Sequence, residues 1–232
     1  MAARKPKIQK TNGICSLCTG VFGKTAMKKH IVQCLQKPLS RKPSGFSVPI
    51  RTRLFTILIE GSFMHEYWIF IEVPANSFLR GLDTFLRNTW VECCGHLSTF
   101  TINGKRYMSE TDEYFKEYKS MNYLLEKALR PGIEFSYEYD FGSPTTLNLK
   151  VVYEREVEDS DRSINILARN EPPLVNCDSC GKIATYICRQ CSHSGEGWVC
   201  EDCASDHECG EEILLPVVNS PRVGVCGYSG GD

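Results

Sequence analysis

Eight cysteine and histidine residues in the last quarter of the chain limit the folds that this segment can adopt. Three Cys-x-x-Cys pairs are followed by a histidine and a cysteine, and the candidate ligands are Cys177, Cys180, Cys188, Cys191, Cys200, Cys203, His207 and Cys209. A zinc ion in a structural site takes four such ligands in a tetrahedron, and one Cys-x-x-Cys turn supplies two of them. The spacing therefore predicts two closed zinc sites.

Two pairings of these eight residues are compatible with the spacing. In an interleaved pairing, as in cross-brace domains of the B-box or RING kind, the first and third Cys-x-x-Cys pairs share one ion. The second pair then shares the other ion with His207 and Cys209. In a sequential pairing, the first two pairs share an ion. We favour interleaving, because roughly 33 residues carry too few apolar side chains to fix two separate loops by packing. His193 competes with His207 as a ligand.

The predicted sites have a structural character. Four protein ligands for each ion leave no vertex for water, so the ions should hold the fold and should not catalyse a reaction. Metal binding to such segments is coupled to folding, and we expect the segment to be unfolded without metal.

The composition is that of a globular protein in a reducing compartment. Of the 232 residues, 42% are hydrophobic and 24% are charged. No apolar run approaches the roughly 20 residues that a bilayer demands, and the first residues lack the apolar core of a signal peptide. We therefore expect a cytoplasmic protein, in which thirteen cysteines indicate metal binding more than disulfides.

The charge is distributed unevenly along the chain, although the net charge is only -1. Residues 1–53 contain 12 lysines and arginines and no acidic residue, whereas residues 54–232 contain all 28 acidic residues. Such a basic segment is typical of an element that binds a polyanion. A basic tail that only keeps the protein in solution is the alternative.

A zinc-finger motif lies inside the basic segment. Its candidate ligands are Cys15, Cys18, His30 and Cys34, with Phe22 and Met27 between the two ligand pairs as its small core. A hairpin with the first two ligands should precede a helix over residues 24–36, where His30 and Cys34 share one face. The basic residues of this helix that could contact phosphate are Lys24, Lys28 and Lys29. One finger reads only about 3 base pairs, so it would give affinity with little selectivity, and a protein-binding role is the alternative.

The sequence predicts an α+β protein with a central mixed or antiparallel sheet, one main helix packed on the sheet, and zinc modules at both ends. The expected parts are a finger over 1–36, a linker over 37–49, an α+β domain over 50–170, a double-zinc module over 171–211, and a tail over 212–232 that packs on the core.

Periodicity predicts the elements of the central domain. The expected elements are a hairpin of strands 51–60 and 66–73, a helix over 77–88 capped by Asn76 or Ser77, a strand over 97–102, a helix over 122–129, a hairpin of alternating strands 133–140 and 147–153, a solvated acidic connection over 154–161, and a last strand over 162–168. Tyr67, Trp68 and Phe70 are expected in the core of this sheet, although aromatic side chains can also stack on bases.

Two phrases in the central domain, Trp90-Val-Glu-Cys-Cys-Gly-His-Leu-Ser-Thr-Phe100 and Tyr137-Glu-Tyr-Asp-Phe-Gly142, carry a family resemblance. Over about residues 50–155 the chain resembles the plasmid Ri open-reading-frame-three-like family, also described as insertion-element passenger proteins of TnpR type. The tail over 216–228 looks like the end of longer, zinc-bearing members. The resemblance implies a small α+β domain associated with mobile elements. Many members have Trp and His shortly after the second phrase, where this chain has Thr145, Thr146 and Leu147.

Two sets of residues in the central domain are candidates for chemistry. Cys93, Cys94 and His96 could form a nucleophile pair or part of a metal site, with Cys226 as a further ligand. Adjacent cysteines are more often buried apolar residues, and we favour that interpretation. Asp140 could act as a general acid or base, but a carboxylate that caps the following turn at Gly142 and Ser143 explains it more simply.

Three functional hypotheses follow from these observations. The first is a non-enzymatic protein with three zinc ions, whose basic finger contacts nucleic acid and whose C-terminal module docks a partner. The second is a zinc-built adaptor that binds only proteins. The third, which we favour least, is an enzyme acting on nucleic acid with Cys94, His96 or Asp140 in its site.

Overall fold

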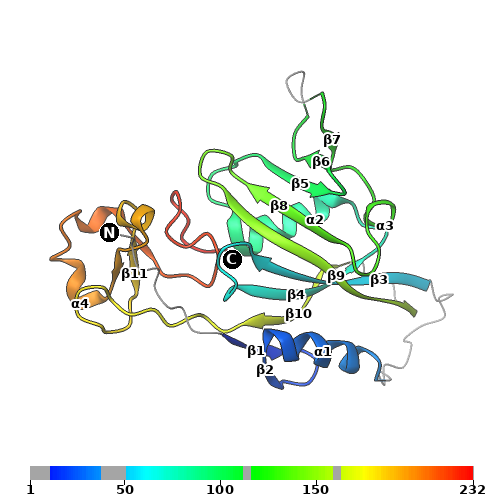
Figure 1. The fold of residues 1–232 in the computed structure, drawn as a ribbon, viewed down its shortest axis with the longest axis horizontal. Helices are drawn as coiled ribbons and strands as arrows, with labels where there is room; N and C mark the ends of the chain where they lie inside the picture. The colour runs from blue at the N-terminus through cyan, green and yellow to red at the C-terminus, as the bar shows by residue number, and fades with distance from the viewer. Residues whose placement is uncertain (1–10, 38–50, 112–115, 159–162, 232) are drawn as a thin grey trace.

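The computed structural model describes residues 11–37, 51–111, 116–158 and 163–231. Ten of the described strands form one sheet in the order β2-β1-β10-β4-β3-β9-β8-β5-β6-β7 (Figure 1). Neighbouring strands are antiparallel except for β6 and β7, which are parallel. The predicted α+β class with a central mixed sheet and zinc-type modules towards both ends is confirmed. Among the described residues, no helix has the length and apolar character needed to cross a membrane.

The centre of the sheet is the predicted hairpin of β3 (Arg51–Gly61) and β4 (Trp68–Pro74). The second predicted hairpin, β8 (Glu134–Tyr139) and β9 (Thr145–Glu158), pairs with it through β3 and β9. Alternating apolar side chains of these strands point to one face, as the period of two requires. They form the main core of the protein with a layer of helices.

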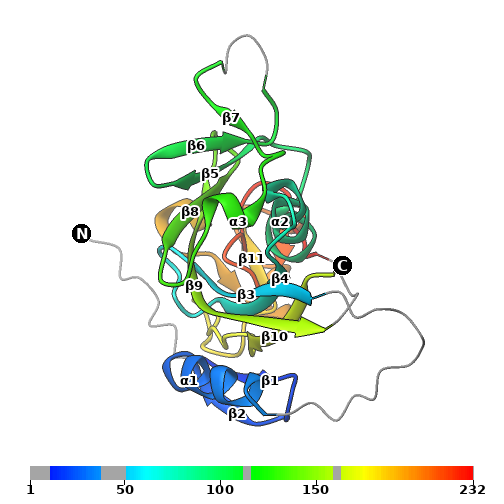
Figure 2. The same ribbon diagram turned by 90° about the vertical axis from the view of Figure 1, so that its right-hand side faces the viewer.

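The helical layer covers this face of the sheet (Figures 1 and 2). It consists of α2 (Leu79–Leu86), which continues into a π-helical turn (Arg87–Val91), and the short α3 (Leu125–Ala128). The predicted side-chain cap at Asn76 or Ser77 is wrong, because no side chain caps α2. The first amide groups of α2 instead donate to the carbonyl oxygens of Tyr123 and Met121. A neighbouring segment therefore satisfies the helix start, which residue spacing could not predict.

Three strands complete the sheet beyond β8. They are β5 (Ser98–Ile102), β6 (Lys105–Met108) and β7 (Lys119–Ser120). The turn at Asn103 and Gly104 joins β5 to β6, and both residues have positive φ angles, as such turns require. The sequence predicted a strand over 97–102 but no strand between it and the helix over 122–129, so β6 and β7 were not predicted.

The predicted solvated connection over 154–161 is wrong for its first half. Strand β9 runs on to Glu158 and pairs with the start of β3, with Arg51 opposite Glu158 and Arg53 opposite Glu156. The Arg53 guanidinium also lies 3.5 Å from the carboxylate of Glu154. Opposite charges on paired strands favour such an extension. Residues 159–161 lie outside the described part of the chain.

The N-terminal finger joins the same sheet. Its hairpin consists of β1 (Asn12–Cys15) and β2 (Val21–Gly23), and β1 pairs with β10 (Asn165–Asn170), which is the predicted last strand. Gly13 is required here, because a Cβ at this position would lie 2.3 Å from the carbonyl oxygen of Arg169 and 2.5 Å from the Trp68 ring. The expected linker over 37–49 lies outside the described residues except for Lys37.

The finger helix α1 (Lys24–Leu35) packs on the sheet face opposite the main core (Figures 1 and 2). A second, smaller core forms there from the finger and from the outward side chains of the sheet, and it includes Met27, Ile31, Trp68, Phe70 and Leu167. Tyr67 belongs to the main core. The three aromatic residues predicted as core are therefore buried, and none of them offers a surface for stacking on bases.

The C-terminal module carries a separate three-stranded sheet in the order β12-β11-β13. Its elements are β11 (Tyr186–Cys188), a 3-10 turn (Cys191–Ser194), β12 (Trp198–Val199), α4 (Glu201–Ala204), a 3-10 turn (Glu211–Ile213) and β13 (Leu214–Pro216). After β13 the tail returns to the central domain, where Arg222, Val223 and Tyr228 are buried.

Candidate metal centres

All thirteen cysteines and three of the five histidines gather into four clusters of four residues. The clusters are Cys15, Cys18, His30 and Cys34; Cys177, Cys180, Cys200 and Cys203; Cys188, Cys191, His207 and Cys209; and Cys93, Cys94, His96 and Cys226. Within each cluster the candidate ligand atoms all lie within 4.8 Å of one another. We call them the finger cluster, the first module cluster, the second module cluster and the tail cluster. Each can hold a metal ion.

The distances inside the clusters match a tetrahedral ion. Zinc bonds of about 2.3 Å to sulfur and about 2.0 Å to nitrogen imply edges of roughly 3.8 Å between two sulfurs and roughly 3.6 Å between sulfur and nitrogen. In the second module cluster, Cys191 Sγ lies 3.7 Å from both His207 Nε2 and Cys209 Sγ. In the first module cluster, Cys180 Sγ lies 3.4 Å from Cys200 Sγ.

The finger cluster is formed by the end of β1, the turn after it and one face of α1. Cys18 Sγ and Cys34 Sγ lie 3.1 and 3.2 Å from His30 Nε2. The Phe22 ring stacks on the His30 ring with centroids 4.1 Å apart, which fixes the orientation of the imidazole. Thr19, which directly follows Cys18, adopts a positive φ of 61°. The sequence spacing of the four residues is thus realised on a hairpin followed by a helix.

The two module clusters have the interleaved arrangement, and His207 is the histidine that takes part, with His193 outside the cluster. In each module cluster one buried cysteine has a lowered pKa, whereas the pKa of the neighbouring thiols Cys180, Cys191 and Cys203 is raised. Burial raises the pKa of Cys177, but backbone N–H groups of Cys200, Cys180 and Ser179 lower it more, to about 6. In the second module cluster the pKa of Cys188 is likewise lowered to about 7, against the effect of burial, by backbone N–H groups at Cys191 and Gln190 and by His207. Thiolates are the form that binds metal.

A carboxylate links the loops that carry the two module clusters. Asp178 Oδ2 accepts hydrogen bonds from the backbone N–H groups of Gly197 and Trp198, at 2.7 and 2.9 Å. Gly197 itself has a φ of 97°, and a Cβ there would lie 2.7 Å from Cys191 Cβ. The loop between the clusters therefore needs glycine both for its backbone conformation and for space.

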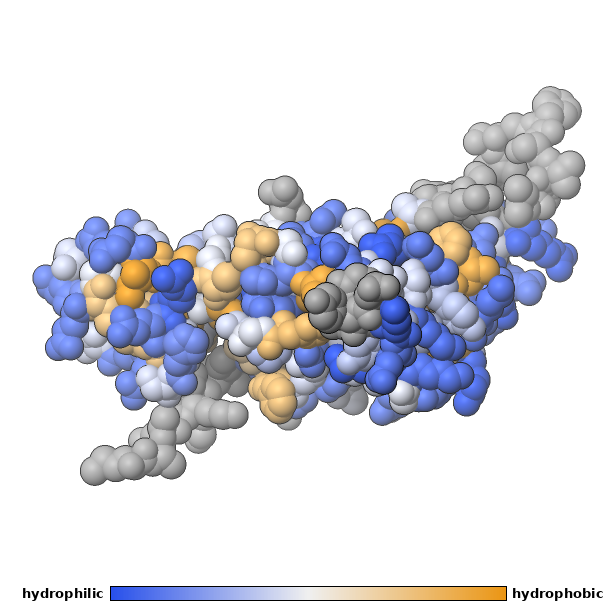
Figure 3. All heavy atoms as spheres, turned by 90° about the horizontal axis from the view of Figure 1, so that it is seen from above, coloured by the Kyte–Doolittle hydropathy of each residue, from blue (hydrophilic) through white to orange (hydrophobic). Residues whose placement is uncertain are grey.

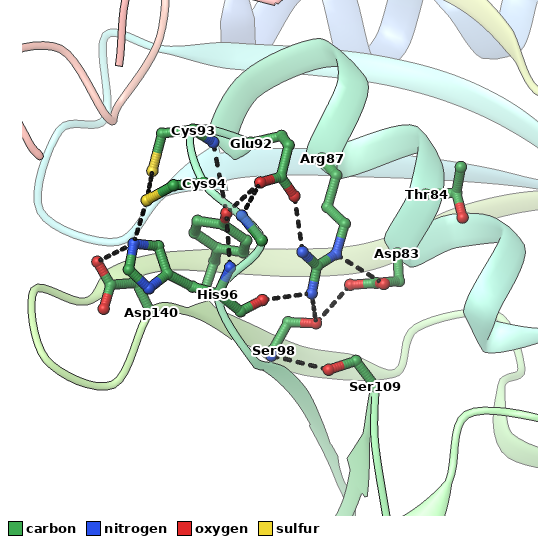
Figure 4. Close-up of polar contacts among 12 residues, drawn as sticks. Asp83, Thr84, Arg87, Glu92, Cys93, Cys94, His96, Ser98, Ser109 and Asp140 are labelled. Atoms are coloured by element: carbon green, nitrogen blue, oxygen red, sulfur yellow. Dashed lines mark hydrogen bonds and ion pairs between the residues drawn. The ribbon is translucent and has the colours of Figure 1, made fainter. Parts of the chain in front are cut away.

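The tail cluster brings together residues that lie up to 133 positions apart in the sequence. Cys94 Sγ lies 2.9 Å from His96 Nε2 and 3.5 Å from Cys93 Sγ (Figure 4). It also lies 3.7 Å from Cys226 Sγ. Cys94 is exposed and the other three residues are half-buried. The favoured interpretation of the adjacent cysteines as buried apolar residues is therefore wrong. The alternative that the sequence offered, a metal site of Cys93, Cys94 and His96 with Cys226, names the four residues that the structure brings together.

Asp140 has the capping role that the sequence favoured. Its Oδ1 accepts hydrogen bonds from the backbone N–H groups of Gly142 and Ser143, at 3.0 and 3.2 Å. Its Oδ2 lies 2.8 Å from the Arg222 guanidinium and 3.5 Å from His96 Nε2. Burial works to raise the pKa of Asp140, but these hydrogen bonds and charges hold it below its usual value.

The three lysines predicted to contact phosphate differ in their surroundings. The Lys24 ammonium forms an ion pair with the Glu60 carboxylate and donates to the carbonyl oxygen of His65 at 3.1 Å. Lys28 is half-buried, and Lys29 is exposed. Helix α1 therefore offers Lys29 to solvent, whereas Lys24 lies against the sheet.

The fold and the clusters define an α+β sheet protein with closed Cys/His sites at its edges. No family model and no curated protein matches the sequence. Among solved structures, the chain is similar to a protein of unknown function from Methanosarcina mazei Go1, with a TM-score of 0.42 and 16% identity. The match covers 56% of this chain and 75% of that chain. A similarity of this size assigns no function.

Proposed function

We propose that the protein is a non-enzymatic zinc-binding protein that associates with nucleic acid through its basic N-terminal segment. The observation that carries the proposal is the position of the finger helix. One face of α1 is fixed on the sheet by the finger cluster and by Met27 and Ile31, and the opposite face presents Lys29, Gln33 and Gln36 to solvent. Lysine and glutamine side chains are suited to contacts with phosphates and bases.

The charge of the segment supports the same proposal. Ten of the 12 basic residues of positions 1–53 precede, belong to or follow this finger, the other two being Arg51 and Arg53 of β3, and no acidic residue lies among them. A cation-rich element of this kind binds nucleic acid mainly through phosphate contacts, with little sequence selectivity. The resemblance to insertion-element passenger proteins is consistent with a role near mobile elements.

Zinc is the metal that we propose for the finger cluster and the two module clusters. The finger cluster and the second module cluster have three cysteines and one histidine, and the first module cluster has four cysteines. Sets of this composition with tetrahedral spacing are typical of structural zinc. With all four vertices occupied by protein, the ions serve to hold the finger and the module in shape.

Titration of binding against salt tests the nucleic-acid part. The full-length protein should bind mixed-sequence DNA or RNA at about 50 mM salt, and log Kd should rise linearly with log salt. Lys29→Gln should weaken binding to all sequences and reduce the salt slope by about 1, because it removes one phosphate contact. Lys24→Gln is the matched control on the same helix and should change the slope much less. Absence of binding at about 50 mM salt, or a Kd indifferent to salt, would reject the proposal.

A protein-binding adaptor is the second candidate, and one observation favours it. A pocket of about 480 Å³ lies between the C-terminal module and the central domain, next to Phe63 and lined by Met64, Trp198 and Val223. The Phe63 side chain is 84% exposed. Figure 3 shows apolar residues in small separate patches spread over a mainly hydrophilic face. Partner capture that survives nuclease treatment and is lost on Phe63→Ser, but not on Lys29→Gln, would favour this function.

A further inference from the structure

The tail cluster contains every cysteine that the other three clusters leave out. The finger cluster and the two module clusters contain ten of the thirteen cysteines, and the remaining three all belong to the tail cluster. Cys93 and Cys94 are neighbours in one loop, and His96 follows Cys94 by two positions. These three residues lie next to Cys226, which comes from the C-terminal tail. Chance proximity of unrelated thiols would not be expected to give the same four-ligand set as the finger cluster.

The ligand atoms of the tail cluster have the spacing of a tetrahedral site. Cys94 Sγ lies 3.5 Å from Cys93 Sγ and 3.7 Å from Cys226 Sγ, slightly below the sulfur–sulfur edge of roughly 3.8 Å expected around zinc. The two sulfur–nitrogen distances to His96 Nε2, 2.9 Å from Cys94 and 3.8 Å from Cys226, lie on either side of the expected edge of roughly 3.6 Å. No pair of the sulfurs is close enough for a disulfide, whose bond length is about 2.0 Å.

The buried Arg222 next to the cluster favours negative charge on the sulfur of Cys93. Arg222 is completely buried, and its guanidinium donates to Cys93 Sγ at 3.2 Å and to Asp140 Oδ2 at 2.8 Å. The same side chain donates to Thr145 Oγ1 at 2.9 Å and to the carbonyl oxygen of Ser143 at 3.2 Å. Hydrogen bonds from a charged donor are strongest to an ionised acceptor. A metal-bound thiolate at Cys93 meets this requirement.

The loop that carries three of the ligands is held in place by a polar network (Figure 4). The Tyr139 hydroxyl accepts hydrogen bonds from the backbone N–H groups of Cys93 and His96, at 3.4 and 3.2 Å, and donates to Glu92 at 2.7 Å. Arg87 binds the Glu92 carboxylate at 2.7 Å and the carbonyl oxygen of His96 at 2.7 Å. Metal ligands are typically oriented by such surrounding hydrogen bonds.

We propose that Cys93, Cys94, His96 and Cys226 form a fourth zinc centre, which ties the C-terminal tail to the sheet domain. The ligand set of three cysteines and one histidine suits zinc. Cys226 adopts a φ of 56°, a conformation that L-residues rarely adopt and that needs external support. A bond from its sulfur to the ion provides that support.

The consequence of this centre is the position of the whole C-terminal module. The tail follows β13, the last strand of the module, and it contacts the central domain through Ser220, whose hydroxyl donates to the Trp90 carbonyl oxygen at 2.6 Å. The ion fixes the tail a few residues beyond these contacts. Among the four clusters, the tail cluster is the one without a fully buried member. A chelator should therefore remove its metal first.

Native mass spectrometry of the full chain tests the proposal. The wild-type protein should carry four zinc ions, and Cys226→Gly and Cys94→Ser should each carry three. Cys226→Gly suits the test because glycine adopts a positive φ freely, so the backbone is not disturbed. His193→Ala is the control, since this histidine lies outside the clusters, and it should keep four ions. A wild-type count of three that stays three in Cys226→Gly would overturn the proposal.

Hydrogen exchange provides a second measurement that does not depend on the variants. Limited chelation that removes one ion from the wild-type protein should increase exchange in residues 217–228 at least tenfold, while β11 keeps its protection. Release of the first ion from the finger or the module, with the tail still protected, would contradict the assignment. Nucleic-acid binding should be unchanged in Cys226→Gly, so a failure of this proposal and a failure of the proposed function remain distinguishable.

Discussion

The central sheet and the C-terminal module differ in the interactions that can stabilise them. The sheet encloses a continuous apolar core that includes Ile57, Ile71, Leu82 and Trp90. The module contributes few buried apolar residues to this core, among them Ala184, Ile187 and Trp198, and it has two clusters that can hold metal. Small units bury too little surface to fold without such support. We therefore expect bound metal to stabilise the module and apolar packing to stabilise the sheet.

Removal of metal should have the largest effect, and it should separate the two regions. Structural zinc contributes roughly 10–16 kcal/mol per site in finger peptides, so the metal-free module should lose its structure. Hydrogen exchange should show unprotected amides in β11 and β13 but continued protection in β3, β4 and β9. Protein treated with zinc-saturated chelator is the control. A metal-free protein with a protected β11 would show that packing, and not metal, holds the module.

Asp83→Ala should give the largest effect of a single substitution inside the sheet domain. The buried Asp83 carboxylate lies 2.9 Å from the Arg87 guanidinium and accepts hydrogen bonds from Ser98 at 2.6 Å and Tyr137 at 2.8 Å. Loss of one member of a buried ion pair costs about 3–5 kcal/mol, because the other charge stays buried. Urea denaturation should show this loss of unfolding free energy.

Thr84→Ala is the matched control for this substitution. Thr84 is the next residue of α2, is exposed, and donates only to the Arg80 carbonyl oxygen of its own helix. Its replacement should change the unfolding free energy by less than about 0.5 kcal/mol. Equal stability of the two variants would mean that the buried network is not important for the sheet domain.

Tyr67→Phe should stabilise the sheet domain, and more so at alkaline pH. The Tyr67 hydroxyl is buried and has no hydrogen-bond partner among the described residues. An unsatisfied buried hydroxyl costs about 1–3 kcal/mol, so its removal should be favourable by about 1 kcal/mol at neutral pH. Burial also raises the pKa of Tyr67 well above its ordinary value of 10.

The direction of the pH effect follows from linkage. Above about pH 10 the unfolded chain loses this proton while the folded protein keeps it, so each further pH unit removes about 1.4 kcal/mol of stability. The wild-type protein should therefore lose stability faster than Tyr67→Phe between about pH 10 and 11. Urea midpoints for both proteins at pH 8 and in this range measure the difference. Parallel pH curves would contradict the prediction.

Lys24→Met should have the smallest effect. The pair of Lys24 and Glu60 joins the finger helix to β3, and both side chains are about one quarter exposed. Partly exposed ion pairs of this kind contribute about 0–1 kcal/mol, and the contribution falls with salt. Unfolding at low and high salt should reveal a small difference that disappears at high salt. A large, salt-independent loss would mean that the finger depends on this pair more than on its metal cluster and apolar contacts.

Local patterns in the sequence determined much of this protein. Alternating residues predicted both central hairpins, because a strand places successive side chains on opposite faces. The finger cluster and the interleaved module clusters also follow from spacing, since Cys-x-x-Cys turns and the i, i+4 positions of a helix fix the separation of two ligands within a few residues.

Only the tertiary structure decided the contacts between distant segments. Cys226 reaches Cys94 because the tail returns from the module to the sheet, and no pattern near either residue records that path. The same holds for the start of α2, the extension of β9 to Glu158 and the pairing of β1 with β10. Residue spacing determines geometry within a turn or a strand. The pairing of strands that lie more than 100 residues apart depends instead on the packing of the whole chain.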